Sequence, residues 1–210
     1  MNVLVVLGLS LLLPLLSAAA VMDPIGDTYG TGMPFDISSV SGITNGGSTT
    51  FEIRFSSPVP APLDANLWGG IEIDVDRNAA TGKSSELDYP NMNFTHGVDY
   101  VIGFYYDDEL GKAAILDVTN DAFFFLPAEY GTDYVRITVP VTGLGGDPRM
   151  HYAVGVGDGL NINSPYSDIA GNDYTLLVTE TPEPRTWFLC GTALAIVAMA
   201  RRRVRASVGC

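Results

Sequence analysis

The chain has 210 residues, of which 24 are acidic and 11 are basic, and its net charge at neutral pH is −13. This length suits one domain of ordinary size with its own core. So acidic a chain repels nucleic acid and anionic lipid and favours cations, which excludes nucleic acid as a partner of the folded part.

Residues 1–20 are typical of a secretory signal peptide. The run 3–16 is apolar, and the alanines at 18–20 offer a small-residue cleavage site before Val21. No lysine or arginine precedes the run, so only the α-amino group is positive there. We expect signal peptidase to cut after Ala20 and the chain to be exported.

The segment 21–184 holds all 24 acidic residues but only 6 of the 11 basic ones, so its net charge is −18. The two cysteines, Cys190 and Cys210, both follow this segment. No disulfide can therefore hold the exported domain, which must rely on its core or on bound metal.

Between the two ends the residue pattern is that of β-strands. Apolar and polar side chains alternate in 51–55, 71–75 and 135–139, and a period of two places each apolar set on one face. Further strands are expected at 35–41, 98–106, 113–119, 122–126, 150–157 and 174–178. About nine short strands predict an all-β fold, a single antiparallel β-sandwich over residues 21–180 with jelly-roll-like or immunoglobulin-like topology.

The strongest candidate for a site opens a long connection and reads Glu-Ile-Asp-Val-Asp-Arg-Asn-Ala-Ala-Thr-Gly over 72–82. Alternation places the first three carboxylates on one face of a strand end, where like charges repel unless something neutralises them. Oxygen ligands at alternate positions before a turn suit a hard cation such as Ca²⁺. The expected ligands are Glu72, Asp74, Asp76, Asn78 and Thr81, with Glu86 or Asp88 completing the set.

This segment is not an EF-hand, because Ala79 occupies the glycine position and Ser85 the position of the bidentate glutamate. It resembles the Asp-x-Asp-x-Asn-x-x-Thr-Gly stretch that recurs in exported bacterial β-sandwich modules. The alternative interpretation is a solvated strand end in which Asn78 forms an Asx-turn.

Other acidic groups are weaker candidates. The run 107–109 falls in an expected hairpin turn, where exposed acids are ordinary. Asp23 and Asp27 begin the exported chain and are candidates to cap a sheet end. Four oxygen-bearing residues late in the domain are candidates for a second cation site or an extension of the first: Asp158, Asp168, Asn172 and Asp173.

Catalysis finds little support in the chain. The two histidines, His96 and His151, are not spaced as in metalloenzymes, and no nucleophile elbow or phosphate-binding loop is present. We therefore expect no enzyme activity. The alternative function is glycan binding, for which Trp68, after a proline-rich loop, would be the stacking platform.

The C-terminal end carries an ordered set of features. Pro182, Glu183 and Pro184 hold the chain extended, and residues 186–200 form a short uncharged span. A basic cluster then follows: Arg201, Arg202, Arg203 and Arg205. Such a cluster is expected to stay in the cytoplasm, which leaves the rest of the chain outside.

This set, over residues 181–205, resembles the PEP-CTERM sorting signal of bacterial surface proteins that an exosortase processes. The resemblance implies a precursor anchored in the inner membrane through 186–200 and processed near Pro182–Pro184. It also implies a final place on the cell surface or in an extracellular matrix, where exopolysaccharide would be a neighbour. An ordinary C-terminal membrane anchor is the alternative.

Overall fold

The structure is a computed structural model that describes residues 20–28, 35–59, 67–85, 87, 97–105, 112–158, 167–170 and 176–180. The predicted signal peptide, apart from Ala20, and the predicted sorting signal at 181–205 lie outside these residues. Within the described part of the chain, no helix is long and apolar enough to span a membrane.

The described residues are almost entirely β-strand. The longer strands are β2 (Ile37–Asn45), β3 (Ser48–Phe55), β4 (Leu67–Asp74), β5 (Tyr100–Tyr105), β6 (Lys112–Asp117), β7 (Ala122–Tyr130), β8 (Tyr134–Pro140) and β9 (His151–Asp158). The short ones are β1 (Val21–Met22), β10 (Asp168–Ala170), β11 (Leu176–Leu177) and β12 (Thr179–Glu180), and one 3₁₀ turn, η1 (Val141–Leu144), follows β8.

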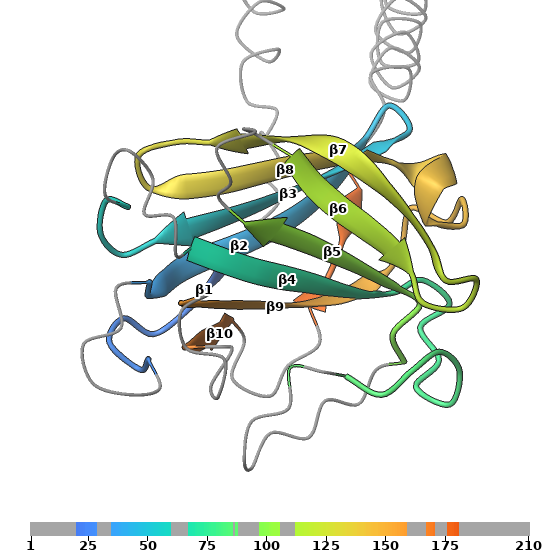
Figure 1. The fold of residues 1–210 in the computed structure, drawn as a ribbon, viewed down its shortest axis with the longest axis horizontal. Coiled ribbons are helices and arrows are strands. Elements are labelled where there is room, and N and C mark those ends of the chain that lie inside the picture. The colour runs from blue at the N-terminus through green and yellow to red at the C-terminus, as the bar shows by residue number, and fades with distance from the viewer. Residues whose placement is uncertain are drawn as a thin grey trace, which may run out of the picture.

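The strands form one hydrogen-bonded path in the order β1-β2-β3-β8-β7-β6-β5-β4-β9-β10. Every pair on this path is antiparallel, and the strands curve around a shared interior, so the sheet is barrel-like (Figure 1). The last described segment joins the two ends of the sheet: β11 pairs with β9, and β12 pairs with β2 in parallel. Between them, the Val178 amide donates to the Met150 carbonyl at 3.0 Å.

Strand β7 makes the sheet continuous because it changes partner half-way. Its residues from Ala122 to Pro127 pair with β6, and those from Ala128 to Tyr130 pair with β8. Pro127 has no amide hydrogen to donate, so the change of partner falls where the ladder is weakest.

The interior is filled by the apolar faces of these strands. In β3, Phe51, Ile53 and Phe55 are buried while the residues between them are half-exposed, as a period of two requires. Tyr152 of β9 packs edge-on against Phe51, with ring centroids 5.3 Å apart. A continuous core of this kind, rather than disulfides, holds the described domain together.

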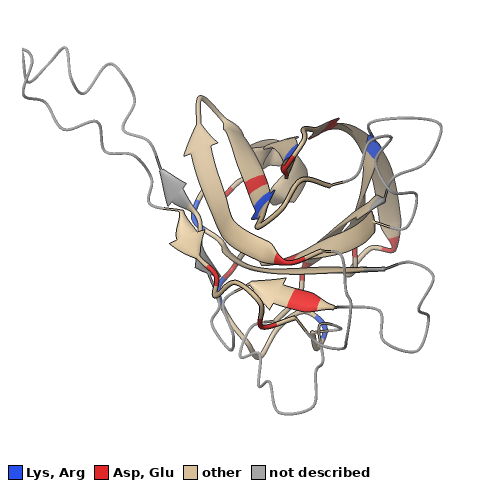
Figure 2. Ribbon diagram, turned by 90° about the vertical axis from the view of Figure 1, so that its left-hand side faces the viewer, with Lys and Arg blue, Asp and Glu red and all other residues tan. Residues whose placement is uncertain are grey.

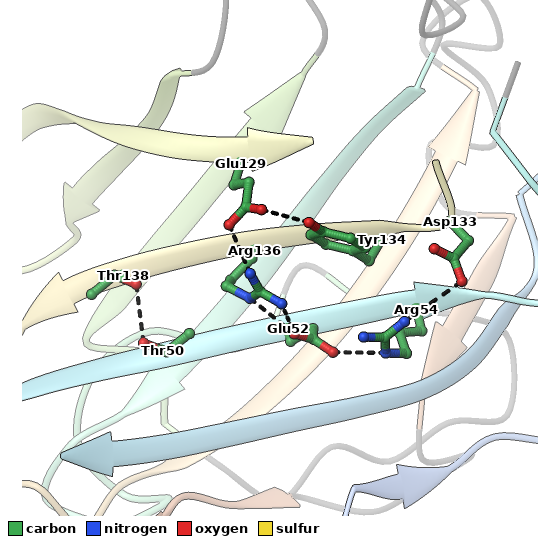
Figure 3. A network of polar contacts seen from close by, with 8 residues as sticks. All are labelled: Thr50, Glu52, Arg54, Glu129, Asp133, Tyr134, Arg136 and Thr138. Carbon is green, nitrogen blue, oxygen red and sulfur yellow. Dashed lines mark hydrogen bonds and ion pairs between the residues drawn. The ribbon is translucent and has the colours of Figure 1, made fainter. Parts of the chain in front are cut away.

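The outer face of β3 and β8 carries a polar network in which acids and arginines are matched (Figure 3). Arg136 donates to Glu52 at 2.6 Å and to Glu129 at 2.7 Å, and its guanidinium lies 4.7 Å from the ring centroid of Tyr134. Arg54 binds Glu52 at 2.7 Å. Because these charges neutralise one another across the strands, we interpret this face as a paired polar surface and not as a binding site.

The all-β class and the antiparallel pairing predicted from the sequence are confirmed. The turn between β2 and β3 has Gly46 and Gly47 at positive φ (58° and 86°), as a tight hairpin requires. The predicted division into two packed sheets differs from the structure, because β7 joins the two halves into one barrel-like sheet.

Candidate metal centre

The centre of the candidate site is the end of β4. Asp74 is its last residue and is 1% exposed, although it is a carboxylate. The chain then leaves the sheet through Val75 and Asp76, and Asp76 is exposed. A buried aspartate at a strand end is unusual unless its charge is compensated.

A third carboxylate comes from the neighbouring strand. Ile73 of β4 pairs with Tyr100 of β5, and this antiparallel register sets Asp99 beside Asp74. One carboxylate oxygen from each of Asp74, Asp76 and Asp99 lies within 4.8 Å of the other two. Asp99 is not among the ligands predicted from the sequence, because the sequence carries no local signal that β4 pairs with β5.

The turn after β4 is tied to these carboxylates by its backbone. The Asn78 amide donates to Asp76 Oδ1 at 2.9 Å and to Asp74 Oδ1 at 3.2 Å. The Thr81 hydroxyl lies 2.8 Å from Asp76 Oδ2 and 2.8 Å from the Asn78 carbonyl. Asn78 Oδ1 accepts from the Ala80 amide at 3.2 Å, which is the Asx-turn of the alternative interpretation.

Glu72 belongs to a different arrangement from the one expected. It is 2% exposed, and its carboxylate accepts hydrogen bonds from the Ser85 hydroxyl and from the Leu87 amide. It is therefore not one of the three clustered carboxylates, and it anchors the connection that follows the turn. Of the other predicted ligands, Asn78 and Thr81 border the cluster, and Glu86 and Asp88 lie outside the described residues.

The charges of the cluster are not matched as those of the β3–β8 face are. Within the described part of the chain, no lysine or arginine forms an ion pair with Asp74, Asp76 or Asp99. Among the described residues, the nearest basic atom is His151 Nδ1, 4.0 Å from Asp74 Oδ2. Burial raises the pKa of the Asp99 carboxyl, and the negative charges of Asp76 and Asp74 raise it further.

This arrangement suits a hard divalent cation. Three carboxylates at the end of β4 and just before β5, with the Asn78 carbonyl and the Thr81 hydroxyl beside them, supply only oxygen, which Ca²⁺ prefers. A bound cation would remove the repulsion that raises the pKa of Asp99. We call Asp74, Asp76 and Asp99 the β4–β5 carboxylate cluster.

A second group of acids lies where the exported chain begins. Carboxylate oxygens of Asp23, Asp27 and Asp168 lie within 4.8 Å of one another, and Asp168 is 1% exposed. Asp168 accepts from the Ile169 amide at 2.9 Å and from the Ile37 amide. Burial raises the pKa of Asp168 to about 7, and the charges of Asp23, Asp27 and Asp36 add to the effect.

The remaining candidates are placed as follows. Trp68 is half-buried and packs against a small cluster of Leu87, Ala153 and Ile169 on the outside of the sheet. His151 is half-buried on β9. His96, the acidic run 107–109, Asn172, Asp173 and the side chain of Asp158 lie outside the described residues.

A comparison with known protein families found no family model that matches the chain, and a search of curated proteins found no match.

Proposed function

We propose that this chain is an exported, non-catalytic bacterial surface protein whose acidic β-domain binds Ca²⁺ at the β4–β5 carboxylate cluster. The observation that carries the proposal is the meeting of three carboxylates, within 4.8 Å, without an arginine or lysine partner in the described part of the chain. The net charge of −18 over residues 21–184 also attracts cations to the domain, which favours cation binding at the cluster.

Export and sorting are proposed from the two ends of the chain. The apolar run 3–16 and the alanines at 18–20 support cleavage by signal peptidase after Ala20. Pro182–Pro184, the span 186–200 and the arginines after it support an inner-membrane precursor that an exosortase processes. The processed domain then reaches the cell surface or an exopolysaccharide matrix.

A structural role is preferred here to glycan binding. A glycan-binding platform needs an exposed aromatic ring, whereas Trp68 is half-buried against Leu87, Ala153 and Ile169. In the proposed role, the cation ties the end of β4 to the start of β5 and stiffens a domain that has no disulfide.

The experiment is a titration of the purified exported protein with Ca²⁺, in which the melting temperature is measured at each Ca²⁺ concentration. A ligand that binds only the folded state at ~100 times its Kd stabilises by about 2.7 kcal/mol. For a domain of this size that corresponds to a rise of about 5–10 °C. We expect the rise to disappear in the variant Asp74→Asn/Asp76→Asn.

The control removes two charges from elsewhere on the surface. Asp121→Asn/Asp133→Asn changes two described aspartates that are not in the cluster, and it should keep the full rise. If both double variants lose the rise equally, Ca²⁺ acts through general screening and the site is refuted. If the unchanged protein shows no rise, the carboxylates belong to a solvated turn.

A further inference from the structure

A group of exposed phenylalanines lies at the start of β7. Phe123 is 66% exposed and Phe125 57% exposed, and their rings meet edge-on with centroids 5.8 Å apart. Phe124 points to the opposite side and lies over Gly143, 3.4 Å from where a side chain on that glycine would begin. Water-exposed phenylalanines in such number are costly unless they meet an apolar partner.

In the rows of Phe123 and Phe125, β6 and β5 widen this surface without adding charge, and the exposed Lys112 of β6 lies in the next row of the same face. In register, Phe123 lies beside Leu116 of β6, and Leu116 lies beside Val101 of β5. The next row of the same face runs from Phe125 to Ala114 and Gly103. The four residues of β6 and β5 are half-exposed. We call these six residues the β7 patch: Val101, Gly103, Ala114, Leu116, Phe123 and Phe125.

The described chain ends at the same end of the barrel as the exposed phenylalanines. Glu180 of β12 pairs with Thr44, next to the turn that joins β2 to β3. That turn is held to η1, because the Val141 amide donates to the Gly47 carbonyl at 2.9 Å. Gly143 of η1 in turn lies close to Phe124, because a side chain on this glycine would begin 3.4 Å from the Phe124 ring. Strands β7, β8, β3 and β2 lie next to one another across this part of the barrel (Figure 1).

The linker from this end to the predicted membrane span is short. Only residues 181–185 separate Glu180 from the uncharged span at 186–200. A fully extended chain advances about 3.3–3.6 Å per residue, so these residues reach roughly 20 Å at most. A precursor anchored through 186–200 therefore holds this end of the barrel against the bilayer, within reach of its interfacial region.

From this geometry we propose that the β7 patch docks on the surface of the lipid bilayer while the precursor is anchored. The proposal rests on the sorting function proposed above. Apolar and aromatic side chains are the kind that enter the bilayer interface, and the six residues of the patch carry no charge. A sugar would need rings that lie flat in one plane, whereas Phe123 and Phe125 stand at 84° to each other.

A second copy of the chain is the less favoured occupant. Two copies would bring together surfaces that each carry a net charge of −18 over residues 21–184. The anchored bilayer needs no such approach, because the linker already brings it to the end of the barrel at which the patch lies. Zwitterionic lipid, which has no net charge, is the matching surface for so acidic a domain.

The test uses the membrane precursor reconstituted in phosphatidylcholine vesicles that contain a nitroxide-labelled lipid. Cys190→Ser and Cys210→Ser remove the native thiols, and a fluorescent label is placed through Ala122→Cys, next to the patch. The matched position is Ser57→Cys, which is exposed beyond the opposite end of β3. We expect several-fold stronger quenching by lipid at position 122 than at position 57.

The patch itself is tested by Phe123→Ser/Phe125→Ser in the same labelled chain. Loss of quenching at position 122, with the chain still recovered in floated vesicles, supports docking by these rings. Equal, weak quenching at both positions in floated chains overturns the docking but leaves the anchor intact. If the chain does not float with the vesicles, the proposed anchor is refuted instead. If the label at position 122 is quenched only in chains that cross-link to a second copy, the patch belongs to a dimer interface.

Discussion

Asp168 shows how a single carboxyl can make stability depend on pH. It is 1% exposed at the edge of the sheet, and burial is the main reason that its pKa rises to about 7. The amide of Ile37 binds the charged form and opposes this rise, while Asp23 and Asp27 reinforce it. The folded domain therefore holds a proton at this position that the unfolded chain releases near pH ~3.9.

The sign of the effect follows from the raised pKa. Protonation of Asp168 stabilises the fold fully below about pH 4, and this contribution is lost as the pH rises through about 7. In the presence of a chelator, we expect the melting temperature of the unchanged protein to fall over that interval. Asp168→Asn, which resembles the protonated acid in shape, should flatten the fall.

The comparison is a thermal unfolding series in EDTA, with Asp121→Asn as a variant that removes an exposed carboxylate. That control should follow the unchanged protein. Parallel curves for Asp168→Asn and the unchanged protein would show that Asp168 is not the group that titrates.

At the scale of the element, the candidate centre depends on how closely β5 begins against the turn after β4. Gly97 precedes β5, and a side chain there would start 1.8 Å from the Thr81 carbonyl oxygen and 3.0 Å from that of Asn78. The Lys83 and Val98 backbones exchange hydrogen bonds of 2.9 and 2.8 Å beside this contact. Only glycine allows the two segments to approach so closely.

Gly97→Ala should therefore push the turn away from Asp99. Overpacking of this kind costs about 1–3 kcal/mol, and it should lower the melting temperature by several degrees and weaken the response to Ca²⁺. Gly103→Ala is the matched control, because open space surrounds the position of its new side chain. Calorimetry with and without Ca²⁺ measures both, and an unchanged Gly97→Ala protein would contradict the packing argument.

At the scale of the whole molecule, the acidic charge and the direction of the strands decide how the proposed sites lie relative to the predicted membrane span. Acidic positions outnumber basic ones in the described part of the chain (Figure 2). The ends of β4, β6 and β8 and the starts of β5, β7 and β9 share one end of the barrel, as their antiparallel pairing requires. The carboxylate cluster and the phenylalanines of β7 therefore lie at the end from which the chain continues towards the predicted membrane span.

The proposed sorting of the whole chain has its own test. Pro182→Ala/Pro184→Ala removes the extended, proline-held segment that we expect the processing enzyme to recognise. In a host with an exosortase, the full-length precursor should accumulate in the inner membrane and the surface fraction should fall. Cell fractionation with immunoblotting measures both quantities.

Pro24→Ala/Pro58→Ala replaces two exposed prolines within the domain and should be processed normally. If Pro182→Ala/Pro184→Ala is processed as well as the unchanged protein, residues 186–200 are an ordinary membrane anchor.

The sequence by itself determined the strand class and much of the candidate centre. Alternating patterns such as Phe51-Ile53-Phe55 specify which face of a strand is buried, because the side-chain period of a strand is two. The spacing of Asp74 and Asp76 before a turn likewise placed two carboxylates close together, because neighbours along one strand stay neighbours in any fold.

Only the tertiary structure decided which distant strands meet. The pairing of β4 with β5 brought Asp99 to Asp74, and the packing of β10 against β2 brought Asp168 to Asp23 and Asp27. The double pairing of β7 joined two sheets into a barrel-like one. Such contacts depend on how the whole core packs, and residues far apart in a sequence carry no local signal of their partners.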